Sequence, residues 1–382
     1  MLTTRTRIVL RHEFVETWKK PLFRVLVFLL VLTSWGFSSG GMQIQSGDTT
    51  VGGGARAWVT SEFSFALLLT FLVPMLYGFF GSIASGVAIL SDDEARISDM
   101  LLSTPLTPSE YVWGKFLGIF GASSSALGVH LLATFFFYHA VPDPTAAEIH
   151  GPFDLLNYLR PALVFALPTL VFYLGVAFFL GERWRRPITV FLFPTAVMML
   201  DVFFLRSWGP TWLDSRVNQL LMLVDPSGYR WLNETWLELD RGVEVYNTTR
   251  IGLDAPFVIS RLAFLGIGLL GVRLAERHLA AHFREKSGSV SRLLRSRPSA
   301  PPQADAAVAP FPRPLEALQM AGRPVGLFRG AATVAVTELK NLLASPGLYL
   351  FGVLIVILTV SNSLLTFGAF GEELILTPGK LA

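Results

Sequence analysis

The sequence has no cysteine and it is poor in charge, since Asp, Glu, Lys and Arg together make up 15% of the 382 residues. Without thiols the chain can form no disulfide, no thiolate nucleophile and no zinc–thiolate site. Soluble domains carry about 25% charged residues, whereas 52% of this chain is hydrophobic and 13% is aromatic. The composition therefore excludes a water-soluble globular protein and predicts an all-α fold, a polytopic helical membrane protein.

Motifs that mark common enzymes are absent as well. The sequence contains no G-x-x-x-x-G-K-[ST] phosphate-binding loop and no H-E-x-x-H zinc-protease motif. We therefore do not expect an enzyme, and we expect no catalytic residue, no metal site and no cofactor in this chain. The net charge of +3, from 31 basic and 28 acidic residues, gives no indication of nucleic-acid binding.

Long apolar runs dominate what is present. Six runs are expected to be membrane spans. The second is long enough to cross a bilayer as a helix with length to spare, and Pro74 is expected to kink it. The charged residues Arg24, Lys115, Asp201 and Arg261 lie toward the ends of the runs, so we expect no mid-membrane network that could drive ion-coupled transport. The six predicted spans are residues 22–37, 63–90, 116–138, 161–181, 187–205 and 255–272.

The histidines in and near the spans each allow two interpretations. We interpret His130, inside the third run, as a buried, hydrogen-bonded residue rather than as a proton relay. His278 and His282 lie one helical turn apart after the sixth run, close to Arg277 and Arg284. We interpret them as solvated helix residues rather than as metal ligands. The energy for any work across the membrane is therefore expected to come from another subunit.

The spans form the frame of one unit, residues 1–286. Residues 5–21 mix basic and apolar side chains, which is typical of an amphipathic elbow helix lying along an anionic leaflet. More than two thirds of the 31 basic residues lie on the side of the N-terminus and of residues 91–118, so the positive-inside rule places both in the cytoplasm. A polar segment at residues 206–254 is then on the outer side.

A linker is predicted after the first unit. Residues 287–328 are rich in Pro, Ala and Ser, which is typical of a flexible segment, and the orientation places them in the cytoplasm.

The start of the chain is repeated after the linker. Glu13 and Pro21 stand just before the first span, and Glu338 and Pro346 recur with the same spacing just before another apolar run. Residues 329–382 are therefore expected to begin a second unit, with an elbow and one span, a seventh. The odd number of spans and the broken repeat predict that the chain is a fragment of a longer protein.

The polar stretch at residues 91–118 separates the second and third spans. Ser91 and Glu94 are spaced as a capping box, which predicts the start of a short helix, and a proline ends that helix. Thr107 and Glu110 are spaced as a second capping box with a proline at the first helical position, which predicts the start of the third-span helix. The expected geometry is a short helix between two sharp turns.

The short helix is predicted to be amphipathic. Ile97, Met100 and Leu101 follow the i, i+3, i+4 spacing of a narrow apolar face, while charged residues fall on the other side. Spacing alone leaves two interpretations open. The helix either rests on lipid headgroups or serves as a rigid element that contacts a partner protein.

The residues of this stretch resemble the cytoplasmic coupling loop of the type-2 ABC exporter permeases. The resemblance consists of an acidic–basic cluster at residues 92–96, Leu-Leu-Ser-Thr-Pro at residues 101–105 and Gly-Lys-Phe-Leu-Gly at residues 114–118. Many relatives have a small residue after the charged cluster, where this chain has Arg96 and Ile97. The resemblance implies a membrane subunit that works with a cytoplasmic ATP-binding cassette subunit, which binds the ATP, and with a second permease half.

The resemblance also implies which residues meet the ATPase subunit. The apolar residues of the short helix are expected to be buried anchors in a groove of that partner, with the charged ones at the rim setting the register. The predicted coupling residues are Glu94, Arg96, Ile97, Asp99, Met100 and Leu101.

The outer segment, residues 206–254, has an apolar helical face at residues 212–224. This face is interpreted either as an anchor in the outer interface or as a gate helix at the exit of a lateral pathway. Asp-Pro-Ser-Gly at residues 225–228, Asn-Thr at 247–248 and Leu-Thr-Pro-Gly at 376–379 resemble one subgroup, the long bacterial permeases with two six-span halves. Some members of that subgroup continue into a zinc aminopeptidase domain.

Two classes of function therefore compete. The favoured one is the membrane subunit of an ATP-driven exporter in the bacterial inner (plasma) membrane, moving a substrate that the sequence does not identify. The alternative is a non-transporting subunit that passes the force of the ATPase to an enzyme or assembly on the outer face. A periplasmic domain encoded after the second half would favour the alternative.

Overall fold

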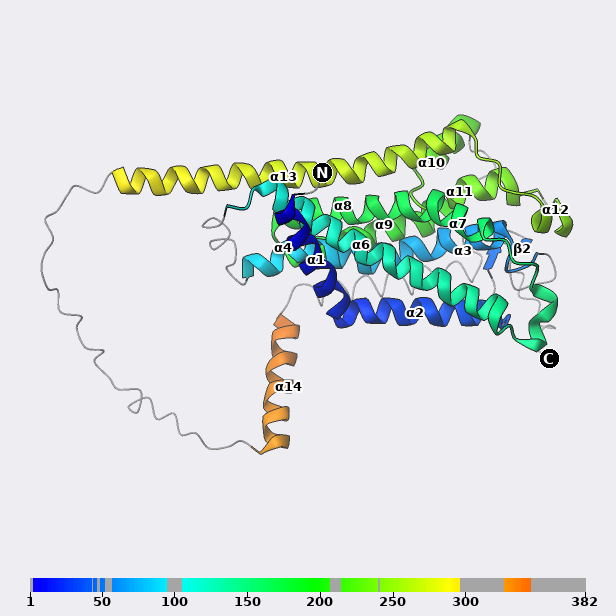
Figure 1. Cartoon of the computed structure of the whole chain (residues 1–382), viewed down its shortest axis with the longest axis horizontal. Coiled ribbons are helices and arrows are strands. Elements are labelled where there is room, and N and C mark those ends of the chain that lie inside the picture. The colour runs from blue at the N-terminus through cyan, green and yellow to red at the C-terminus, as the bar shows by residue number, and fades with distance from the viewer. Residues whose placement is uncertain are drawn as a thin grey trace, which may run out of the picture. The chain divides into compact units, whose positions relative to one another are not determined.

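The structure is a computed structural model, and it describes residues 3–42, 44–46, 49–51, 57–94, 105–206, 214–239, 241–295 and 326–344. The chain divides into two compact units, Met1–Ser296 and Arg297–Ala382. The first unit contains the elements up to α13 (Ala255–Arg295), and α14 (Leu327–Ala344) belongs to the second (Figure 1).

Six helical stretches within the described residues are long and apolar enough to cross a membrane, which agrees with the six spans expected there. They are Pro21–Ser38, Glu62–Asp92, Pro108–Ala140, Leu156–Trp184, Pro187–Arg206 and Ala255–Ala281. The prediction of a polytopic helical membrane protein is thus confirmed. The described strands form one short antiparallel hairpin, in which Ile44 pairs with Val51 and Ser46 with Thr49; its strands are β1 (Ile44–Ser46) and β2 (Thr49–Val51).

The spans are assembled from α-helices interrupted by π-helical turns. A kink was expected at Pro74, and the structure has a π-helical turn there. The wider turn occurs where proline has no N–H to donate to the backbone hydrogen bonds of the helix. The N-terminal helix and the helical pieces of the spans are, in chain order, α1 (Thr4–Lys19), α2 (Pro21–Ser38), α3 (Glu62–Leu72), η1 (Val73–Gly78), α4 (Phe79–Glu94), α6 (Pro108–Phe135), η2 (Phe136–Ala140), α7 (Leu156–Pro161), η4 (Ala162–Ala166), α8 (Leu167–Trp184), α9 (Pro187–Leu200), η5 (Asp201–Arg206) and α13.

Short elements close the end of the unit opposite to the N-terminus of α1. A 3-10 helix, η3 (Pro144–Ile149), follows the third span, and four short pieces precede α13. In Figure 1 several of these pieces lie beside α3 and α7 at one end of the bundle. The four pieces are α10 (Ser215–Val224), α11 (Tyr229–Leu232), η6 (Asn233–Leu237) and α12 (Val243–Thr248).

Helix α8 is the centre of the bundle, because it packs against α4, α13 and α9. Its contact with α13 is backbone to backbone. A Cβ built on Gly268 would lie 2.3 Å from the carbonyl oxygen of Val171, and one built on Gly175 would lie 2.0 Å from the carbonyl oxygen of Gly268. Small residues let two helices approach closely in a membrane, where van der Waals packing replaces the hydrophobic effect between helices.

The expected N-terminal helix is present as α1, and one of its sides packs along the first half of α6. Its buried residues are the polar Thr6, Glu13 and Thr17, while Ile8 is 64% exposed and Val15 is also exposed. Basic side chains share the exposed side of α1 with these apolar ones, which suits the headgroup region of a leaflet. The expectation of a helix resting only on the leaflet is therefore incomplete, because α6 covers the side that carries the buried polar residues.

The C-terminal part of the chain is described only in pieces. Helix α13 continues to Arg295, beyond residue 287, where the linker was expected to begin. In the second unit, α14 contains Glu338, one of the repeated residues. The predicted seventh span lies outside the described residues, so the division into a linker and a second permease unit stays a prediction.

The close contact of α8 with α13 gives a prediction for a matched pair of glycines on α13. Gly268→Ala should lower the thermal stability of the purified protein by about 1–3 kcal/mol, since the added methyl group has no room beside Val171. Gly266 has nothing within 4 Å of an added Cβ, so Gly266→Ala should leave stability unchanged or raise it through helix propensity. Thermal unfolding in detergent measures both, and equal melting temperatures would contradict the packing.

Candidate functional site

The predicted coupling residues lie almost wholly outside the described residues. Arg96, Ile97, Asp99, Met100 and Leu101 belong to the undescribed stretch 95–104, and Glu94 is the last residue of α4. The structure does describe both ends of this stretch, and the candidate site is therefore built from those ends. We call it the loop base, and its residues are Glu13 of α1, Asp92 of α4, and Thr107, Glu110, Tyr111 and Lys115 of the α6 segment.

The capping box expected at the start of α6 is confirmed. The hydroxyl oxygen of Thr107 accepts a hydrogen bond from the backbone N–H of Glu110 at 3.2 Å, and the Glu110 carboxylate accepts one from the backbone N–H of Thr107 at 3.1 Å. Pro108 occupies the first turn, as expected. Because its first amides are satisfied, α6 begins at a defined residue just after the undescribed stretch.

The capping box expected at Ser91 and Glu94 is wrong. Helix α4 continues without interruption to Glu94, and the Ser91 hydroxyl donates to the carbonyl of Ala88 at 3.1 Å. The amides near Ser91 are already bonded within the helix, so the serine has no orphan amide to cap and bonds backward instead. The second span therefore reaches further toward the loop than its apolar run indicates.

Helix α1 holds the other end of the loop. The Thr3 hydroxyl donates to the Glu110 carboxylate at 2.7 Å, and the Arg5 guanidinium donates to the carbonyl of Pro105. Arg5 also lies 4.0 Å from the Glu110 carboxylate. The residue just after the undescribed stretch is thus fixed to the first turn of α1.

The centre of the loop base is Lys115, which is 5% exposed. Its ammonium lies 2.8 Å from the Asp92 carboxylate and 3.1 Å from the Glu13 carboxylate, and it donates to the carbonyl of Ala88 at 2.7 Å. The Tyr111 hydroxyl donates to the same Asp92 carboxylate at 2.6 Å. All three ammonium protons therefore have acceptors, and one side chain joins α1, α4 and α6.

Close approach of α1 to α6 makes this geometry possible. A Cβ built on Gly118, the last residue of the Gly-Lys-Phe-Leu-Gly sequence, would lie 2.7 Å from the Leu10 carbonyl oxygen. Further along, the Trp18 indole donates to the Ser125 hydroxyl at 3.0 Å. The glycines of this sequence thus form the surface on which α1 lies, and its lysine reaches Glu13 from there.

A second buried carboxylate ties α8 to α13 near the turn after α8. Glu182 is 0% exposed, and its carboxylate lies 3.1 Å from the Arg185 guanidinium and 3.3 Å from Nδ1 of His278. The Trp113 indole donates to the Glu276 carboxylate at 3.0 Å, which joins α6 to α13. His278 lies on α13 with its side chain 36% exposed, which agrees with its interpretation as a solvated helix residue, but it also contacts a buried acid on a neighbouring helix.

His130 fits its interpretation as a structural residue. It is fully buried in α6, and its Nδ1 lies 3.0 Å from the Tyr77 hydroxyl of η1. Among the residues that the structure describes, no group of three His, Asp or Glu side chains is placed to hold a metal ion.

The opposite end of the bundle has its own charged cluster, which sequence reasoning missed. The Asp225 carboxylate is fully buried and accepts hydrogen bonds from the backbone amides of Ser227 and Arg230, both at 2.8 Å. Gly228 has a φ of +77°, a conformation that glycine adopts without cost. The Asp-Pro-Ser-Gly sequence is therefore a tight turn that is buried in the bundle, with its backbone amides bonded by its own aspartate.

Three arginines anchor this turn. Arg261 of α13 donates to the Pro226 carbonyl at 2.7 Å, and Arg230 donates to the Leu205 carbonyl at 3.2 Å. Arg206 donates to the Asp201 carboxylate at 2.9 Å. The sequence shows Asp201 and Arg261 only as charges near the ends of spans. Each of these two spans adjoins the same outer segment, residues 206–254, and that shared position is the sequence signal that could have placed them together.

The apolar outer helix expected at residues 212–224 is present in part, as α10. Val217, Leu220 and Val224 are exposed on it, while the Leu223 carbonyl accepts a hydrogen bond from Ser260 of α13 at 2.8 Å. The Asn247 side chain accepts a hydrogen bond from the backbone N–H of Trp58 at 2.8 Å. These contacts fix the segment to the bundle, and the choice between an anchor and a gate stays open.

Comparison with known families agrees with the resemblance of residues 91–118 to an ABC permease loop. Residues 7–185 match the family described as ABC-2 family transporter protein. The matched part is a little under half of the chain, begins in α1 and ends at the turn after α8, so it includes the whole loop base. The match supports an ABC-2-type permease and, with the six spans, a multi-pass membrane protein of the ABC transporter class. No curated protein matches the chain.

Lys115 gives a test of the loop base. Lys115→Met should destabilise the protein by about 3–5 kcal/mol, because the buried Glu13 carboxylate and the partly buried Asp92 carboxylate lose their closest cation. The triple variant Lys115→Met with Glu13→Gln and Asp92→Asn should recover most of that loss, since no buried charge is then left unpaired. Thermal unfolding in detergent compares the two.

The control for these two variants is Lys19→Met, which removes a lysine whose side chain is 64% exposed and which forms an ion pair with its neighbour Glu16. An exposed pair of this kind contributes little to stability, so the variant should melt like the parent. A triple variant no more stable than Lys115→Met would show that the buried charges are not what holds the loop base.

The outer turn is tested by Asp225→Ala. The backbone amides of Ser227 and Arg230 lose their acceptor, and backbone hydrogen exchange at residues 225–232 should accelerate roughly ten-fold or more. The matched control is Glu238→Gln in the same outer segment, where the neighbouring Glu234 raises the pKa of the Glu238 carboxyl. That control should leave exchange at the turn unchanged, and equal exchange in both variants would contradict the role of Asp225.

Proposed function

We propose that this chain is the transmembrane subunit of an ATP-driven ABC exporter. It couples ATP hydrolysis by a separate cytoplasmic ATP-binding cassette subunit to the movement of a substrate across the inner membrane of a bacterium, with its own N-terminus in the cytoplasm. The family match over residues 7–185, the six spans and the excess of basic residues on one side support this proposal. ATP is bound by the partner, and a second permease half completes the membrane part.

The observation that carries the coupling mechanism is the loop base. An ATPase dimer that closes can do work on the spans only if a stiff element transmits its motion. Residues 95–104 connect α4 to the α6 segment, and both sides of that connection are fixed through Asp92, Lys115 and Glu110. A displacement of the loop would therefore move α1, α4 and α6 together instead of bending one turn.

Within this proposal the loop meets the ATPase subunit through residues of two kinds. Ile97, Met100 and Leu101 enter a groove of the partner as apolar anchors, and burial of their side chains supplies the affinity. The charged residues at the rim set the register through screened ion pairs; they are Glu94, Arg96 and Asp99.

The alternative function is the transmission of ATPase force to an enzyme or assembly on the outer face, without transport. The outer segment held by Asp225 and Arg261 is the part that such a partner would contact. A periplasmic domain in the full-length gene, together with the absence of substrate movement by the reconstituted complex, would favour this alternative.

The coupling site is tested by Leu101→Asp. A charge placed in an apolar groove costs several kcal/mol, so co-purification of the ATP-binding cassette subunit in detergent and stimulated ATPase activity should both fall at least ten-fold. Asp99→Asn removes one rim charge and should change retention of the partner by less than about three-fold. Membrane insertion should persist in both variants, because neither residue is in a span.

Two results would overturn the proposal at different levels. If Leu101→Asp retains the ATPase subunit as well as the parent does, residues 95–104 are not the coupling site, and the interpretation in which this stretch rests on lipid headgroups is favoured. If the reconstituted full-length protein moves a substrate with no ATPase subunit present, the chain is not the membrane subunit of an ATP-driven transporter.

A further inference from the structure

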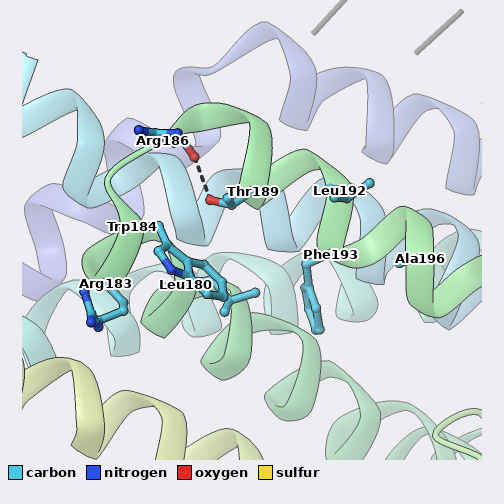
Figure 2. A pocket seen from close by; sticks show the side chains of 8 residues that line it. All are labelled: Leu180, Arg183, Trp184, Arg186, Thr189, Leu192, Phe193 and Ala196. Atoms are coloured by element: carbon cyan, nitrogen blue, oxygen red, sulfur yellow. Dashed lines mark hydrogen bonds between the residues drawn. The ribbon is translucent and has the colours of Figure 1, made fainter. Parts of the chain in front are cut away.

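An open groove lies between the end of α8 and the first turns of α9 (Figure 2). Its volume is about 800 Å³. Figure 2 shows Arg183, Trp184 and Leu180 on the α8 side and Phe193 pointing from α9 toward them. The lining residues are Leu180, Arg183, Trp184, Arg186, Thr189, Leu192, Phe193 and Ala196.

Three arginines lie at the turn between the two helices. Arg185 ends α8 in the left-handed conformation, with a φ of +48°, which is uncommon for a residue with a side chain. Its guanidinium bonds the buried Glu182 carboxylate at 3.1 Å, and this contact compensates for the backbone strain. Arg183 and Arg186 stand on either side of this residue, and both line the groove.

The two groove arginines differ from Arg185 in their partners. Among the residues that the structure describes, no carboxylate pairs with the side chain of Arg183 or Arg186, and both are exposed. The N-terminus of α9, which has no side-chain cap, adds its positive dipole end beside Arg186. One end of the groove therefore has an unbalanced positive charge and suits an anion.

The rest of the groove is apolar. Leu192, Phe193 and Ala196 extend from the charged end along α9, and Leu180 faces them from α8. The run from Thr189 to Ala196 covers about 10 Å of helix axis. Trp184, 53% exposed, stands near the charged end, where its ring suits the boundary between headgroups and acyl chains.

We propose that this groove binds one anionic phospholipid from the bilayer leaflet that it faces. The headgroup phosphate lies between Arg183 and Arg186, and an acyl chain lies along Leu180, Leu192 and Phe193. Two arginines close to a membrane surface favour an anionic headgroup over a zwitterionic one. The inference does not depend on the exporter proposal, since it needs only that the chain spans a membrane.

The experiment uses the whole chain in detergent with an equimolar mixture of phosphatidylglycerol and phosphatidylcholine that have the same acyl chains. Native mass spectrometry counts the adducts of each lipid. The parent should retain one phosphatidylglycerol in clear preference to phosphatidylcholine. The double variant Arg183→Ala with Arg186→Ala should lose that preference, a fall on the order of ten-fold for two headgroup contacts.

Two further variants make the result specific. Arg7→Ala with Arg11→Ala removes the same charge from exposed positions on α1 and should keep the preference. Ala196→Trp keeps every charge but fills the apolar part of the groove, and it should also lower retention of phosphatidylglycerol.

Four outcomes would overturn the proposal. Equal loss in the groove and α1 double variants would mean a general effect of charge. Undiminished binding in Ala196→Trp would place the lipid outside the groove. A parent that shows no preference for phosphatidylglycerol would mean that the groove does not select an anionic headgroup. A groove double variant whose loss of lipid comes with a change in oligomeric state would mean that the arginines serve another contact, such as one with a second copy of the chain.

Discussion

The arrangement of α1, α4 and α6 depends on one buried ammonium group. Lys115 is almost inaccessible to solvent, and its contacts with Glu13 and Asp92 join three helices at one point. A charge buried in this way is stable only where its hydrogen bonds are satisfied and its partners are held in place. That requirement fixes α1 against α6 and also fixes the end of α4. The loop between α4 and the α6 segment therefore starts and ends at helices that are joined to each other through Lys115.

The same principle operates at the other end of the bundle with different residues. There Asp201, Asp225 and three arginines hold an irregular turn inside the protein. Irregular backbone at this depth is tolerated only where its polar groups find partners in the protein. The fold therefore combines an apolar middle, packed through close contacts such as those of Gly268, with two charged ends that define the geometry.

The spans could be predicted from the sequence because lipid requires about 20 consecutive apolar residues, a signal that is local in the chain. The second capping box was predictable for the same reason, since Thr107 and Glu110 are three residues apart. The loop base was not, because Glu13, Asp92 and Lys115 come together only through tertiary packing. The error at Ser91 has a similar origin: a capping pattern was present, but the preceding helix already satisfied the amides.

Helix α1 also constrains how the chain is assembled. Its polar residues Thr6, Glu13 and Thr17 are covered by α6, whose contacts with α1 extend to Ser125. During synthesis α1 emerges more than a hundred residues before that partner, and Glu13 cannot enter lipid alone without a large cost in free energy. Helix α1 therefore stays in hydrated surroundings after it is made, and it reaches its final position only once the third span has inserted.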